Sequence, residues 1–452
     1  MTIDILPDDS LLDIFDSFSG PYDVYSRPWN WRRLAQVCRR LRQIILASPH
    51  RLHVQHLCTL GTPVRKLLSF LPDLPIVIDY YDYSDASLTC LSPNDEDDVI
   101  AALEHSNRVS ALNLVVTTTQ LVKLVTVMQA QESYPALKYL RFTLDADSPV
   151  LPDGFFGVSA PNLQVLRLYG VPFPTLPTIL SSASDLVELD LFDIPESGYI
   201  SPEAMAAALA ALSSLQSFSI EFTSNNSCPY RIGLPSVTRT VLPTLVSFDF
   251  RGVSDYLEDL MARIDCPKLK LTRIRYLHRH VGFRVTHLFE FINRLEDPRF
   301  DRIDILFGNV SDNSIQVYHS RNVITISISF HGEEWGVSHI FQVFGQFSAN
   351  LSEVHHLSIC NNRGLEIGDN ELVQFLYPFT PVQTLHASGD WVDHNPLSPE
   401  AVTGEMVTKV LSALGSLHFD SPRAAFFENY IIVRKLSGCN RHQDSLARTM
   451  EF

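Results

Sequence analysis

The chain has 452 residues, of which 45% are hydrophobic and 19% are charged, so it can bury a large core and widespread disorder is not expected. It carries 51 acidic and 35 basic side chains, which gives a net charge of −16. An acidic chain repels a phosphate backbone, and this argues against a nucleic-acid partner.

The cysteines indicate a reducing compartment, and the apolar runs are too short for a membrane span. The seven cysteines are widely spaced and form no Cys-x-x-Cys pair, which argues against a disulfide framework or a zinc ribbon. The first residues do not follow the basic-then-apolar pattern of a signal peptide, and no apolar run is long enough to cross a bilayer. We therefore expect a cytoplasmic or nuclear protein with no membrane partner.

Two short amphipathic helices are predicted near the N-terminus. Pro7 suits the first position of a helix, and Asp8 and Asp9 then lie in the first turn, where carboxylates favour the positive end of the helix dipole. The apolar face of this helix consists of Leu11, Ile14, Phe15 and Phe18. The apolar stripe of the second helix consists of Leu34, Val37, Cys38, Leu41, Ile44 and Ile45. Two such helices bury too little surface to fold alone, so they dock on a partner protein or cap the next domain.

These two stretches resemble an F-box. The family pattern is Leu-Pro-x-Glu/Asp, Leu-x-x-Ile-Phe, and Val-Cys-Arg with a bulky residue, and the chain has these motifs from residues 6, 11 and 37. The resemblance implies an all-α module that binds a Skp-type adaptor and, through it, a cullin complex. The residues that would form the adaptor interface and the module's core are Leu6, Pro7, Leu11, Leu12, Ile14, Phe15, Leu34, Val37, Cys38 and Leu41. The chain departs from the family at Leu41, where Trp is common, and in a longer loop over residues 19–30.

Residues 59–107 are predicted to link the helices to the next domain or to cap it. The run at 74–78 is typical of a strand, and a helix is predicted from Ser92 to about His105. The acidic residues 95–98 lack the alternating ligand spacing and central glycine of a calcium loop. We interpret them as charge at the N-terminus of that helix.

A Leu-x-x-Leu-x-Leu frame recurs along the chain. Successive frames start 28, 26, 23, 29 and 30 residues apart, and Pro-x-Leu introduces several of them. The six frames are Val109-x-x-Leu112-x-Leu114, Leu137-x-x-Leu140-x-Phe142, Leu163-x-x-Leu166-x-Leu168, Leu186-x-x-Leu189-x-Leu191, Leu215-x-x-Phe218-x-Ile220 and Leu245-x-x-Phe248-x-Phe250. Leu271-x-x-Ile274-x-Tyr276 is interpreted as a seventh frame. The last two apolar residues of each frame are two positions apart, so they point to one side of a short strand.

Helical stretches are predicted between the frames, at residues 120–128, 177–182, 202–212 and 256–264. One strand and one helix cannot bury their own apolar face, whereas stacked units form a curved parallel sheet with helices outside. The frames resemble leucine-rich repeats in the divergent form of F-box proteins, a group that includes large families in mushroom-type fungi. The alternative is an ordinary α/β domain with parallel strands.

Beyond Tyr276 the frame degenerates. Residues 303–330 alternate like antiparallel strands, and late frames start at Val354 and Val382. The predicted fold class is therefore α/β, with an N-terminal all-α F-box followed by a leucine-rich-repeat solenoid. The predicted domains are an F-box-like helical module (1–58), a linker or capping region (59–107), leucine-rich repeats (108–276), degenerate repeats with extra β-strands (277–418) and a C-terminal tail (419–452).

No motif predicts catalysis, a cofactor or a metal site. The phosphate loop, Gly-x-Gly-x-x-Gly, Gly-x-Ser-x-Gly and His-Glu-x-x-His patterns are absent. The pairs His278/His280 and His355/His356 lack the further ligands that a metal needs. We therefore expect a protein that is not an enzyme, with a hydrolase or transferase of unrecognised site as a remaining alternative.

The F-box resemblance instead implies a substrate-recognition adaptor of an SCF-type cullin ubiquitin ligase. The helical module would bind a Skp-type adaptor, and the repeats would bind an unknown protein target. Residues between the frame leucines would lie on the concave face of the sheet. The candidates for target binding by this geometry are Gln164, Arg167, Glu188, Asp190, Ser217, Ser219, Ser247 and Asp249. A protein-binding scaffold that acts independently of ubiquitin is the alternative.

Overall fold

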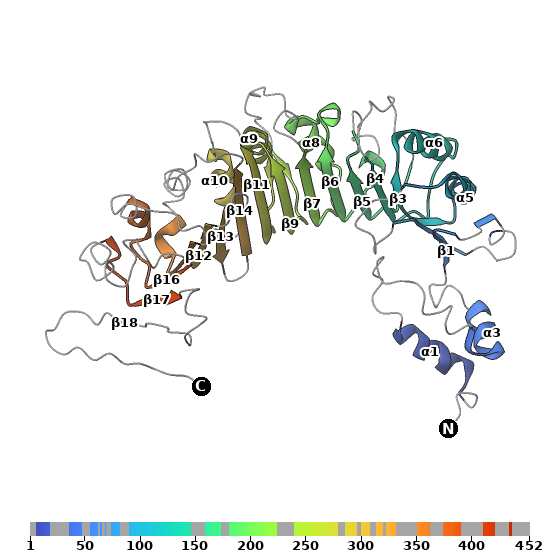
Figure 1. The fold of residues 1–452 in the computed structure, drawn as a ribbon, viewed down its shortest axis with the longest axis horizontal. Helices are drawn as coiled ribbons and strands as arrows, with labels where there is room; N and C mark the ends of the chain where they lie inside the picture. Colours follow the sequence, from blue (N-terminus) through green and yellow to red (C-terminus); the bar gives the residue numbers. More distant parts are fainter. Residues whose placement is uncertain are drawn as a thin grey trace. The chain divides into compact units, whose positions relative to one another are not determined.

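The structure is a computed structural model of the whole chain (Figure 1). The residues that it describes are 6–18, 36–47, 55–61, 64–65, 68, 74–81, 90–145, 159–172, 180–223, 239–278, 285–295, 300–307, 313–319, 322–330, 350–361, 374–389, 410–420 and 434–435. The chain divides into two compact units. Unit 1 contains Met1–Ile200 and Ala211–Leu215, and unit 2 contains Ser201–Ala210 and Gln216–Phe452.

Unit 1 begins with two helices, α1 (Asp8–Phe18) and α3 (Arg39–Ala47). Their facing apolar side chains form a small core with Leu74, which lies just before the first long stretch of sheet. Residues 48–54 between this module and the sheet lie outside the described part of the chain, as does Leu34 of the predicted second helix.

A parallel sheet follows in unit 1, with neighbouring strands in chain order. Its strands are β1 (His56–Cys58), β2 (Ile76–Asp79), β3 (Val109–Val116), β4 (Tyr139–Leu144), β5 (Val165–Tyr169) and β6 (Glu188–Ile194). The second leucines of the first four frames are in register, because Leu112 pairs with Leu140, Leu140 with Leu166 and Leu166 with Leu189. The frames therefore form one parallel sheet in unit 1, as the repeat predicts.

Helices α5 (Pro93–Leu103) and α6 (Thr118–Gln129) cover one side of this sheet (Figure 1). The side chain of Ser92 accepts a hydrogen bond from the Asp95 N–H and so caps α5, as the sequence predicts. Thr117 and Gln120 form a reciprocal capping box at the start of α6. The core of unit 1 lies between these helices and the leucine rows of the strands. A single 3-10 turn, η2 (Glu196–Gly198), follows β6.

Unit 2 continues the same strand-and-helix pattern. Strands β7 (Ser217–Phe222), β9 (Ser247–Gly252) and β11 (Leu271–His278) are parallel neighbours. Helices α8 (Pro202–Leu209), α9 (Ser254–Arg263) and α10 (Thr286–Ile292) lie on one side of them (Figure 1). Two short parallel strands, β8 (Thr240–Val241) and β10 (Ile264–Asp265), form a separate ladder.

The seventh frame lies two residues earlier than the sequence predicts. Phe248 pairs with Thr272 and Phe250 with Ile274, so the frame is Leu269-x-x-Thr272-x-Ile274. Thr272 is buried at a position that is Leu or Phe in the other frames, and Leu271 pairs with Ser247 on the opposite side. A β-branched threonine fits the row of buried side chains that includes Phe248. Because threonine is polar, the frame does not show up as a pattern of apolar residues.

Three further strands, β12 (Arg302–Phe307), β13 (Asn313–His319) and β14 (Asn322–Phe330), form an antiparallel meander, as their alternating pattern predicts. The last strand of the meander, β14, returns beside β11 and pairs with it in parallel. The first, β12, pairs in parallel with β15 (His356–Asn361). The meander therefore lies between the earlier and the later parallel strands of unit 2.

The late frames complete unit 2. Strands β15, β16 (Thr384–Gly389) and β17 (Ser416–Asp420) are parallel, with short 3-10 turns η4 (Asn350–Glu353) and η5 (Tyr377–Phe379) before β15 and β16. Leu357 pairs with Leu385, and Leu385 pairs with Leu417. Leu417 thus marks a further frame, which the sequence analysis did not predict. Strand β18 (Arg434–Lys435) pairs antiparallel with β17, so strand pairing extends into residues 419–452, which are predicted to be a C-terminal tail.

Aromatic side chains fill the core of unit 2 and leave no room for a side chain at Gly252. A Cβ atom there would lie 2.8 Å from Cζ of Phe250 and 2.9 Å from Cδ2 of Phe222. Tyr256 of α9 meets Phe222 edge-on, with the ring centroids 4.7 Å apart, and stacks on Phe250 at 6.0 Å. Because both rings are held by this third ring, they cannot move aside for a larger residue.

Candidate functional site

The N-terminal helical pair buries some of the predicted interface residues and exposes others. Leu11, Leu12 and Leu41 are buried in a core that also contains Ile44, Ile45 and Leu74. Leu6 and Cys38 are partly buried and pack against this core. Leu41, which departs from the family pattern, therefore lies inside the module and not on its surface.

Three predicted interface residues lie outside this core. Pro7 is exposed, Ile14 of α1 is 40% exposed and Val37, just before α3, is 69% exposed. The side chain of Phe15 and the whole of Leu34 fall outside the described residues. The helices thus present apolar side chains at their surface, in the segments for which the sequence predicts adaptor binding.

An arginine from the second helix holds the start of the first. Arg40 donates to the Leu6 carbonyl from Nη2 at 2.6 Å and forms an ion pair with Asp8, with Nη2 2.7 Å from Oδ1. Asp8 is largely exposed and Arg40 is 34% exposed, so water screens the pair. We assign the pair to fixing the geometry of the helices more than to their stability.

The side of the unit 1 sheet that alternates with the leucine rows carries polar and aromatic side chains, and we call it the open face of unit 1. Arg167 of β5 lies in register with Asp190 of β6 and donates from Nε to Glu188 Oε1 at 2.6 Å. Its Nε is also 3.1 Å from Asp190 Oδ2. Gln164, at the start of the same repeat, is exposed, and its carbonyl accepts the N–H groups of Val187 and Glu188. The four predicted target-binding residues of unit 1 are therefore neighbours.

A second arginine on this face has a different environment. The guanidinium of Arg141, on β4, lies 4.2 Å from the ring centroid of Tyr81 and 4.6 Å from that of Tyr169. The Tyr169 ring in turn stacks on Phe192 of β6, with centroids 5.0 Å apart. Thr143, two residues along the same strand face, is 6% exposed. The prediction from sequence missed these residues, although Arg141 and Tyr169 occupy variable positions of the frames.

A carboxylate that feels the charge of this arginine makes its hydrogen bonds elsewhere. Asp79 of β2 accepts from Asn113 Nδ2 at 2.9 Å and from the Tyr81 N–H at 3.3 Å. Burial raises the pKa of Asp79, while these two hydrogen bonds and the positive charge of Arg141 oppose that rise. Burial likewise raises the pKa of Tyr169. Arg141 itself is partly exposed and lies against two aromatic rings.

The corresponding side of unit 2 carries the other predicted target-binding residues. Ser217 is in register with Ser247, and Ser219 with Asp249. Next to them, Arg251 donates from Nη1 to Glu221 Oε1 at 2.5 Å, and Arg275 Nη2 is 3.3 Å from Asp249 Oδ1. The predicted target-binding residues of unit 2 therefore form a row of serines with Asp249, and charged pairs lie beside them.

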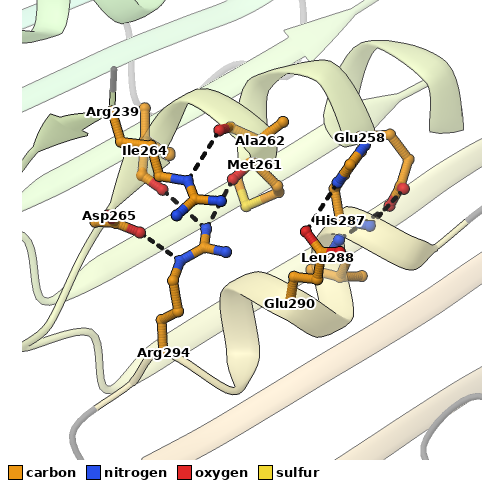
Figure 2. A network of polar contacts seen from close by, with 10 residues as sticks. All are labelled: Arg239, Glu258, Met261, Ala262, Ile264, Asp265, His287, Leu288, Glu290 and Arg294. Atoms are coloured by element: carbon orange, nitrogen blue, oxygen red, sulfur yellow. Dashed lines mark hydrogen bonds and ion pairs between the residues drawn. The ribbon is translucent and has the colours of Figure 1, made fainter. Parts of the chain in front are cut away.

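A polar network joins two successive repeats of unit 2 on the helical side (Figure 2). Glu258 of α9 accepts the N–H groups of His287 and Leu288 at 2.7 and 3.0 Å, and so caps the N-terminus of α10. Burial raises the pKa of Glu258; the two N–H groups and the nearby His287 oppose the rise, and Glu290 adds to it. The buried carboxylate is therefore satisfied by backbone donors, and this is a structural role.

Two arginines cap the C-terminal end of α9 (Figure 2). Arg294 forms an ion pair with Asp265, with Nε 2.5 Å from Oδ1, and donates from Nη2 to the carbonyls of Met261 and Ile264. Arg239 Nε donates to the Ala262 carbonyl at 3.2 Å. These carbonyls have no partner within the helix, so the arginines satisfy groups that the last turn leaves open.

Among the residues that the structure describes, no group of three or more His, Cys, Asp or Glu side chains is arranged to hold a metal ion. His355 and His356 are both exposed, and residue 280 of the other histidine pair lies outside the described ranges. In those ranges no helix is both long and apolar enough to span a membrane.

The fold and its surfaces define a mixed α/β chain of in-register parallel strands, covered by helices on one side and preceded by a pair of helices. No family model matches the chain, and no curated protein sequence matches it. Among solved structures, the leucine-rich-repeat-containing protein LegL7 from Legionella pneumophila is similar over 75% of this chain and 91% of that chain, with 12% identity and a TM-score of 0.28. The fold class rests on the strand register and not on this likeness.

Proposed function

We propose that the chain is a substrate-recognition adaptor of an SCF-type cullin ubiquitin ligase. The N-terminal helical pair binds a Skp-type adaptor, and the open face of the repeats binds a protein target. The chain performs no bond chemistry itself. It raises the effective concentration of the target near the ubiquitin-conjugating enzyme.

The observation that carries this proposal is the division of apolar residues in the helical pair. Leu11, Leu12 and Leu41 supply a core, while Ile14 and Val37 remain exposed next to it. Exposed apolar side chains on a small helical module favour a protein partner, because their burial at an interface is worth about 25 cal/mol per Å². The F-box motif in the same residues indicates which partner.

The test is co-purification of the full chain with a Skp-type adaptor, using variants that spare the core. Ile14→Asp and Val37→Asp place a charge on the exposed side, and each is expected to weaken adaptor binding by about tenfold or more. Leu60→Asp is the matched control, since Leu60 is an exposed apolar residue of unit 1 outside the two helices. We expect it to bind as wild type does.

Failure of the wild-type chain to bind any Skp-type adaptor would overturn the ligase role. Equal binding by wild type, Ile14→Asp and Val37→Asp would show that the adaptor contacts other residues. If the wild-type chain bound no Skp-type adaptor but its repeats still bound a target, the chain would be a ubiquitin-independent scaffold.

A further inference from the structure

Arg141 and Arg167, on the open face of unit 1, differ in the groups that surround their guanidinium. Arg167 is bonded to Glu188 and lies beside Asp190. Arg141, in register with Arg167 on the next strand, has its guanidinium against two tyrosine rings instead. Two carboxylates therefore meet the charge of Arg167, whereas no described carboxylate is hydrogen-bonded to Arg141.

Stacking uses the faces of a guanidinium and leaves its N–H groups available. Within the part of the chain that the structure describes, Arg141 donates no hydrogen bond and lies in no ion pair, and its Nε is buried without a partner. A planar fork of donors held in this way is suited to an oxyanion, which it can bind through two parallel hydrogen bonds.

A second group on the same strand face is also unsatisfied. The hydroxyl of Thr143 is buried and has no hydrogen-bond partner among the described residues. Burying a polar group without a partner costs about 1–3 kcal/mol, so two such groups on one strand face indicate a surface shaped for a ligand. The aromatic stack of Tyr169 and Phe192 beside them offers an apolar contact.

We propose that Arg141, clamped between Tyr81 and Tyr169 with Thr143 beside it, is the receptor for a carboxylate side chain on an acidic segment of the target protein. The carboxylate pairs with the arginine fork, and an apolar neighbour in the segment packs on the aromatic stack. This inference rests on the proposed function, because it names the partner chemistry of the face that we assign to the target. Distant acidic residues of the chain are screened by salt beyond about 8 Å. The nearby carboxylates already have partners, because Glu188 and Asp190 pair with Arg167 and Asp79 accepts from Asn113.

The experiment measures binding of labelled peptides to the full chain by fluorescence anisotropy. The peptides share one length and sequence and differ only in whether their polar positions hold Glu, Gln or Lys. We expect wild type to bind the Glu peptide about tenfold or more tightly than the Gln peptide, and the Lys peptide most weakly. The preference should decline as salt is raised.

Arg141→Gln is expected to abolish this preference, and Arg141→Lys to retain only part of it, because an ammonium group lacks the planar fork. Tyr169→Leu leaves the charge but removes one wall of the clamp, and it should give an intermediate loss. Lys123→Gln is the control: it removes the same charge from the exposed side of α6, on the helical side of unit 1, and should bind as wild type does. Thermal unfolding checks that each variant is folded.

The inference is overturned if wild type binds the Glu and Gln peptides equally, or if Arg141→Gln and Lys123→Gln reduce the preference to the same extent. Skp-type adaptor binding, measured on the same proteins, separates this result from the proposed function. If the chain binds the adaptor but shows no preference for the Glu peptide, only the carboxylate-binding role of Arg141 is overturned. A Glu preference that depends on Arg141, without adaptor binding, supports the receptor and defeats only the ligase role.

Discussion

The N-terminal helical pair and the repeats of unit 1 bury their apolar side chains in different ways. The pair has one small core of Leu and Ile side chains, and it leaves Ile14 and Val37 exposed. Each repeat adds a leucine to rows that continue from strand to strand, and Leu112, Leu140 and Leu166 are almost completely buried. Repeats complete one another's core, whereas the helical pair does not complete its own. The difference teaches that a two-helix module leaves large apolar side chains exposed beside its core, whereas the leucine rows of the stacked strands are buried.

The largest effect is expected in the leucine rows. Leu166→Ala removes a buried side chain that lies between Leu140 and Leu189, and it should lower the free energy of unfolding by about 3–5 kcal/mol. Val165→Ala, on the other side of the same strand, should cost about 1 kcal/mol or less. Denaturant unfolding measures both. Equal losses for the two variants would show that the rows are not the core.

A smaller and more local effect is expected in the helical pair. Leu41→Ala removes part of a core that has few members, and it should destabilise α1 and α3 by about 2–4 kcal/mol. Hydrogen exchange should then become fast in these helices, while strands β3 to β6 keep their protection. If Leu41→Ala instead lowered the main unfolding transition as much as Leu166→Ala does, the helices would be an integral part of the repeat core.

The smallest effect concerns the polar joint between the repeats of unit 2. The pKa of Glu258 is raised in the folded chain, so the folded state holds a proton that the unfolded state has released. Its contribution is fully present below the ordinary pKa of a glutamate and is lost as the pH rises through the raised value. Stability should therefore increase as the pH falls through this window.

Glu258→Gln should remove this part of the pH dependence, and Glu203→Gln, at an exposed position of α8, should not. Thermal unfolding across the window compares the three proteins. A wild-type chain whose pH dependence matches that of Glu258→Gln would show that the carboxylate does not titrate there.

Much of the fold follows from local pattern, because a leucine frame predicts both a short strand and which of its side chains face the core. The rows of β3 to β6 were predictable for this reason. The register of the seventh frame was not, because Thr272 takes the place of a leucine. The strand β1 was missed as well, since it is short and its pairing with β2 is set by residues that are distant in sequence.

The same reasoning explains what could be predicted of the surfaces. Arg167, Glu188 and Asp190 lie at variable positions of adjacent frames, so their proximity follows from the repeat. The clamp around Arg141 does not follow, because Tyr81 comes after β2 and no frame marks that strand. The pairing of β2 with β3 brings the Tyr81 ring within reach of Arg141, which lies one strand further on in β4. A single sequence shows which residues share a face, but not which charges remain without a partner.

The account is tested most directly by hydrogen exchange of the full chain, alone and with a Skp-type adaptor. We expect α1 and α3 to gain protection when the adaptor is added, and strands β3 to β6 to be protected to the same degree in both samples. No change in α1 and α3 would contradict the claim that these helices are a docking site that another protein completes.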